Sequence, residues 1–83
     1  MAHARQPDPG AEAALDAAAL ERQFWRCDAA AAQTRLDIAT VQICSQVTER
    51  LRTLRFGGDL DAMLAWWHAN KAAQHAALAA TRP

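Results

Sequence analysis

The sequence predicts an all-α fold, a small three-helix bundle with a flexible N-terminal arm. Residues 11–56 contain no glycine or proline, and good helix formers such as alanine, leucine, glutamine and arginine dominate there. A Gly57-Gly58 pair then marks a turn before a second helical stretch. No stretch shows the alternation typical of a strand. We therefore expect one helical domain over residues 11–80, with helices spanning roughly 11–35, 38–56 and 59–80.

The first ten residues predict a flexible arm rather than part of the domain. They contain Pro7, Pro9 and Gly10 among polar residues, with no apolar periodicity. Such a segment has too little apolar surface to offset the entropy of ordering it.

The long glycine-free stretch carries two apolar faces rather than one. The first follows alternating steps of four and three, the spacing of a helix–helix seam. It comprises Ala13, Ala17, Leu20, Phe24, Cys27, Ala31, Thr34, Ile38 and Val41. The second, displaced from it, comprises Leu36, Thr40, Ile43, Cys44, Val47, Leu51 and Leu54. The change of face favours a break between Thr34 and Thr40, with Asp37 or Thr40 capping the next helix. The alternative is one continuous helix over 11–56, in a long helical hairpin that dimerises.

The turn after Phe56 has clear stop and start signals. Gly57 can take the left-handed conformation that ends a helix, Gly58 adds freedom for a sharp turn, and Asp59 can cap the third helix. At 100° per residue the third helix has one apolar stripe. The stripe contains Leu60, Met63, Leu64, Trp67 and Leu78. Trp66 lies about 120° from the stripe and needs a second neighbour.

Two aromatic pairs are the candidate partner-binding residues. In Phe24-Trp25 and in Trp66-Trp67, one ring lies on the predicted seam, while Trp25 and Trp66 face away from it. One interpretation is that Trp25 contacts Trp66 inside the bundle. The other is an exposed aromatic patch that anchors another protein or a second copy of the chain.

Composition argues against several classes of function. The formal net charge is 0 and the pI about 6.8, so no long-range field attracts nucleic acid or an anionic membrane. The N-terminus lacks an apolar signal-peptide region, and no apolar run approaches the ~20 residues of a membrane span. We expect a cytoplasmic protein, and the alanine- and arginine-rich usage suggests a bacterial one. In a reducing cytoplasm Cys27 and Cys44 would be small buried thiols, with a disulfide across two packed helices as the alternative.

Neither a metal site nor a catalytic centre is indicated. His68 and His75 lie two turns apart, about 10 Å along a helix axis, too far to share one ion. Cys27 and Cys44 form no CxxC motif, and Ser45, the only serine, has no GxSxG elbow. We therefore expect no metal, no cofactor and no enzymatic activity.

The sequence favours a protein–protein interaction module, acting as an adaptor, accessory subunit or regulator. Its partner would be another protein, or itself in a homodimer. The alternative is a compact DNA-binding regulator that uses the helix carrying Arg50, Arg52 and Arg55. In that helix Glu49 can pair with Arg52, and the three arginines spread around the helix circumference.

Overall fold

The computed structural model confirms the three-helix architecture and describes residues 9–81, with side chains from residue 17 onward. The helices are α1 (Pro9–Gln33), α2 (Ile38–Phe56) and α3 (Leu60–Ala80). Residues 1–8 of the predicted arm lie outside the described residues. Pro9 and Gly10, also assigned to the arm, instead belong to α1. Proline is tolerated there because the first turn of a helix does not use its backbone N–H groups.

The chain breaks where the apolar face changes, so the continuous helix over residues 11–56 is wrong. Residues 34–37 leave the helical conformation. Asp37 is extended (φ −74°, ψ 167°), and its carboxylate accepts the backbone N–H of Thr40 at 2.8 Å. The backbone carbonyl of Asp37 accepts the N–H of Val41 at 2.9 Å, which begins the helical ladder. Asp37 is thus the N-cap that specifies the start of α2.

This cap gives a testable pH dependence. The side chain and backbone N–H of Thr40 hydrogen-bond Asp37 and hold the pKa of its carboxyl below the ordinary value of 3.8. A depressed folded-state pKa contributes stability above the unfolded-state value, and that contribution is lost as pH falls through the folded-state value. Asp37→Asn keeps a good N-cap but does not titrate. Unfolding free energies should therefore differ between wild type and D37N by a constant amount near neutral pH. Below pH 3.8 the wild type should lose stability relative to D37N; identical pH profiles would contradict this role for Asp37.

The second connection is a tight turn fixed by Gly57, Gly58 and Asp59. Both glycines have positive φ, 59° and 86°, which is costly for other residues. The N–H of Gly58 returns to the carbonyl of Arg52 at 3.0 Å, closing the end of α2. Asp59 then caps α3 by accepting the N–H of Ala62 at 3.1 Å.

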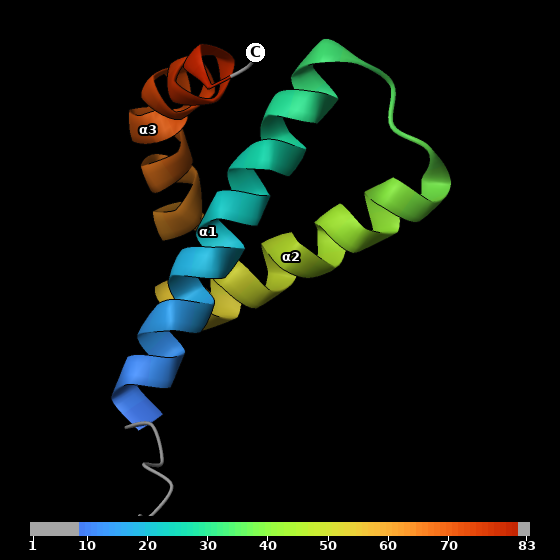
Figure 1. Cartoon of the computed structure of the whole chain (residues 1–83). Coiled ribbons are helices and arrows are strands. Elements are labelled where there is room, and N and C mark those ends of the chain that lie inside the picture. Colours follow the sequence, from blue (N-terminus) through green and yellow to red (C-terminus); the bar gives the residue numbers. More distant parts are fainter. Residues whose placement is uncertain (1–8, 82–83) are drawn as a thin grey trace, which may run out of the picture.

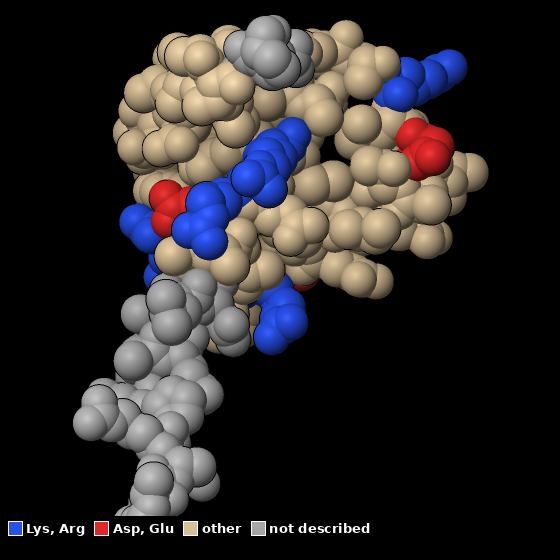
Figure 2. Space-filling model, viewed as in Figure 1, with Lys and Arg blue, Asp and Glu red and all other residues tan. Residues whose placement is uncertain are grey.

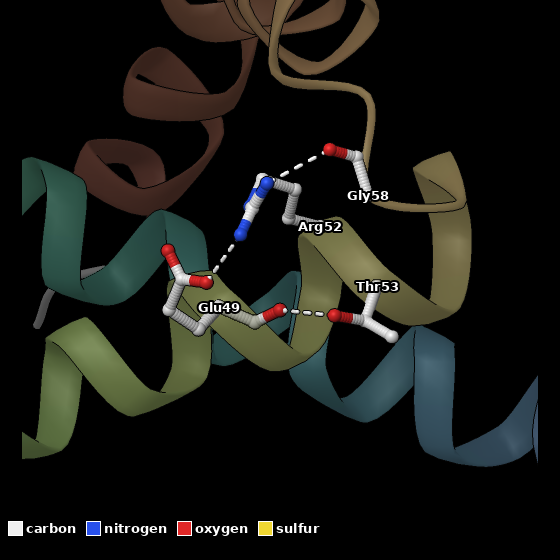
Figure 3. A network of polar contacts seen from close by, with 4 residues as sticks. All are labelled: Glu49, Arg52, Thr53 and Gly58. Carbon is white, nitrogen blue, oxygen red and sulfur yellow. Dashed lines mark hydrogen bonds and ion pairs between the residues drawn. The ribbon is translucent and has the colours of Figure 1, made fainter.

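Arg52 ties this turn back onto α2 (Figure 3). Its Nη1 donates to the carbonyl oxygen of Gly58 at 2.8 Å, and its Nη2 donates to Glu49 Oε2 at 2.7 Å. Two residues one turn apart on α2 therefore supply both the guanidinium that binds the glycine turn and the carboxylate that orients this guanidinium.

The core lies where the three helices meet. Its buried members are Phe24, Trp25, Val47, Leu51 and Met63, and Leu51 has no exposed surface. Around them pack the partly buried Leu20, Phe56, Trp66, Trp67 and Leu78. In Figure 1, the C-terminal part of α2 crosses α1, and from there the two helices diverge toward the connection at residues 34–37. The core therefore fills the crossing and leaves the other end of the α1–α2 hairpin open.

The inward face of α3 is rotated from the predicted stripe. Met63, Trp67 and Leu78 pack inward as expected, but Leu60 and Leu64 are 54% and 44% exposed. Trp66 packs against the core instead. Indole rings bury far more apolar area than leucines, so burying both tryptophans sets the rotation of α3.

Candidate functional site

The predicted aromatic anchors form a cluster inside the molecule. Phe24 and Trp25 of α1 are 8% and 2% exposed, so neither belongs to a surface patch. The ring centroids of Trp25 and Trp66 lie 4.9 Å apart, and those of Phe24 and Trp66 lie 5.5 Å apart. Phe56 completes the contact with Trp66 at 5.2 Å. Trp25 contacts Trp66 because α3 packs directly against α1. This is the contact inside the bundle that the first interpretation of the aromatic pairs expected.

Trp67 is half-buried and belongs to a polar contact between α1 and α3. Its Nε1–H donates to Asp28 Oδ2 at 3.0 Å, and His75 Nε2 lies 2.7 Å from the same oxygen. Lys71 Nζ stands 4.3 Å from the Trp67 ring centroid, and His68 lies against the same ring. This network occupies both helical histidines. The described part of the chain holds no group of three His, Cys, Asp or Glu residues placed to bind a metal ion.

The open end of the α1–α2 hairpin contains a hollow lined by both helices, which we call the hairpin groove. It is an open space of about 390 Å³. Its apolar lining comes from Phe24, Ala31, Leu36, Val41 and the two cysteines, and its polar lining from Asp28, Ser45, Thr48 and Glu49. The groove exists because α1 and α2 diverge away from the core, so their facing apolar residues are too far apart to pack together.

The N-terminal part of α2, which forms most of one wall of the groove, has no charged residue before Glu49. No residue from Ile38 to Thr48 is charged, and in this segment Ile38, Val41 and Ile43 are 79%, 46% and 53% exposed. The apolar periodicity had placed all three among the core residues. They are exposed because α3 runs along α1 on the side away from the N-terminal half of α2, with its C-terminal end beside Ala29 and Ala30 (Figure 1). The sequence signal for this surface was the absence of charge rather than the apolar spacing.

Cys27 of α1 and Cys44 of α2 form a disulfide at the base of this groove, with their Cα atoms 5.8 Å apart. This finding corrects the expectation of two separate buried thiols. The antiparallel crossing brings both inward positions to the separation that a bridge requires. The disulfide fixes how far the two walls can separate.

The three arginines of the DNA-binding alternative do not act together. Arg52 is engaged with Glu49 and the glycine turn. Arg55 pairs with Glu21 of α1 at 2.8 Å and lies over the Trp66 ring. Arg50 is exposed and has no ion-pair partner among the side chains of residues 17–81. Figure 2 shows basic side chains in separate places on one face, with acidic ones among them. A continuous basic surface of the kind that binds the phosphate backbone is not present on that face.

The fold and the groove thus define a small all-α protein with an open, disulfide-bridged hairpin. No family model, curated protein or solved structure matches the chain. No described helix is long and apolar enough to cross a bilayer.

Proposed function

We propose that this chain is a small protein–protein interaction module without catalytic activity. The observation that carries the proposal is the hairpin groove, together with the exposed segment of α2 from Ile38 to Thr48 that has no charged residue. The two charged residues of the lining, Asp28 and Glu49, are engaged within the fold, and scarcity of charge around an apolar hollow is characteristic of the centre of a protein interface. The groove would take apolar side chains from a helix or loop of a partner protein. The chain would then serve as an adaptor, accessory subunit or regulator.

The chemistry of the groove supports binding rather than catalysis. Both cysteines are in the disulfide, so neither supplies a thiolate nucleophile. Asp28 is held by Trp67 and His75, and Glu49 is paired with Arg52. Ser45 lines the groove with no histidine among the lining residues. The DNA-binding alternative has less support, because Arg52 and Arg55 are engaged within the fold.

The cellular location belongs to the same proposal. The sequence led us to expect a bacterial cytoplasmic protein, and that stays a prediction. The Cys27–Cys44 bridge weighs against it, because structural disulfides are typical of oxidising compartments and rare in the cytosol.

A displayed random-peptide library, selected on the oxidised wild-type chain, tests the binding role. We expect recovered peptides to carry apolar residues at helical spacing. Val41→Glu places a charge in the groove and should raise the dissociation constants of these peptides at least about tenfold. Ile43→Glu is the matched control, because Ile43 is similarly exposed on α2 but does not line the groove. Failure to recover any saturable binder, or binders indifferent to V41E, would refute the groove as a binding site.

A further inference from the structure

A second exposed feature of α2 lies on a different face from the groove. Ile43 and Leu54 are 53% and 47% exposed and lie eleven residues apart. Eleven residues are about three turns, so the two side chains share one face, about 16 Å apart along the axis. Gln46 and Arg50 lie between them on the same face and are both exposed. We call these four residues the α2 stripe.

The stripe is bordered by a shallow depression. Gln46, Glu49, Arg50, Thr53 and Leu54 line an open hollow of about 500 Å³. All five lining residues belong to α2, so no other described helix contributes to this surface. The stripe is therefore a helix face that the fold leaves unpartnered.

The order of residues along the stripe reads the same in both directions. It runs apolar, polar, polar, apolar, as Ile43, Gln46, Arg50 and Leu54. In a twofold-symmetric pair the same patch meets itself with the chain direction reversed. Antiparallel α2 helices would place Ile43 of each copy against Leu54 of the other. Gln46 of each copy would face Arg50 of the other.

Charge selects this arrangement over the alternatives. In the antiparallel pair, Arg50 meets an amide that can accept its hydrogen bonds, and Glu49 of the other copy lies beside that amide. In a parallel pair, Arg50 of one copy would face Arg50 of the other, and like charges at an interface are unfavourable. An acidic partner protein would form a favourable charge contact with Arg50 only, and its acidic groups would repel Glu49.

We propose that a second copy of this chain docks antiparallel on the α2 stripe. The proposal rests on the proposed function as an interaction module, but it uses a separate face and leaves the groove open to another protein. The stripe is short, so the dimer is weak, with a dissociation constant of order micromolar or above. Its formation covers two aliphatic side chains per copy that the small monomer cannot bury.

Sedimentation equilibrium over a wide concentration range tests the proposal with the oxidised full chain. We expect a monomer–dimer equilibrium whose dissociation constant rises at least about tenfold in Ile43→Glu. Val41→Glu, two residues away on the groove face, should dimerise like the wild type. A chain that is monomeric at every concentration would overturn the proposal, as would a dimer that I43E leaves intact.

A cross-linking experiment distinguishes the two orientations. A short bismaleimide should join an Ile43→Cys chain to a Leu54→Cys chain when the two variants are mixed, because the antiparallel pair brings these positions together. Either variant alone should cross-link far less. Efficient linkage of I43C to itself would mean a parallel pair and would overturn the arrangement.

The two sets of variants separate this proposal from the proposed function. A wild type that stays monomeric but binds peptides in a V41E-sensitive way would refute the second-copy proposal alone. Dimerisation without any peptide binding would refute the groove alone.

Discussion

Leu51→Ala should remove a large fraction of the free energy of unfolding. Leu51 has no exposed surface and lies in the core between all three helices. Replacing a fully buried leucine by alanine costs about 2–5 kcal/mol, from lost burial and from the cavity left behind. A chain of this length has a total stability of only roughly 4–12 kcal/mol. Urea unfolding followed by circular dichroism should show a large fall in the transition midpoint.

Leu54→Ala is the matched control on the same helix. Leu54 is the same residue type three positions later, but it is 47% exposed. Its replacement should cost less than about 1 kcal/mol at concentrations where the chain is monomeric. Equal losses in the two variants would show that Leu51 is not at the centre of the core.

Local signals in the sequence were enough to predict the helices. Asp37, Gly57 and Asp59 mark the helix ends through chemistry that acts within a few residues. The bounds of α2 were therefore predicted to the residue. The first helix differs by two residues at each end, where no capping residue stands at the expected limits.

Long-range choices were harder to predict. Apolar spacing on α3 fits Leu60 and Leu64 as well as Trp66, and only the rings of Phe24, Trp25 and Phe56 decide between them. Phe24 and Trp25 lie on α1, far from α3 in the sequence. The same limit applies to the candidate site. Ile38, Val41 and Ile43 look like core residues to any local rule, and they become surface because α3 packs along α1 and leaves the N-terminal half of α2 uncovered.

The disulfide clamps the open end of the hairpin. Between Ala31 and Ile43 every residue except Leu36 is exposed, so few side-chain contacts join the two walls beyond Cys27 and Cys44. The bridge closes a loop with a sequence separation of 17. The chain-entropy model assigns such a loop about 3 kcal/mol of stabilisation. For a domain of this size that corresponds to a change in melting temperature of about 12–24 °C.

Reduction of the wild type, or the double change Cys27→Ser and Cys44→Ser, should therefore lower the melting temperature by a similar large amount. The double variant should not respond to reductant, which separates the bridge from general effects of the reagent. Hydrogen exchange should localise the loss. Amides at residues 30–43 should exchange faster on reduction, while those around Val47 and Leu51 stay protected by the core. A wild type whose melting temperature is the same with and without reductant would show that core packing alone holds the hairpin. The width of the groove would then be set by α1 and α2 themselves rather than by the bridge between them.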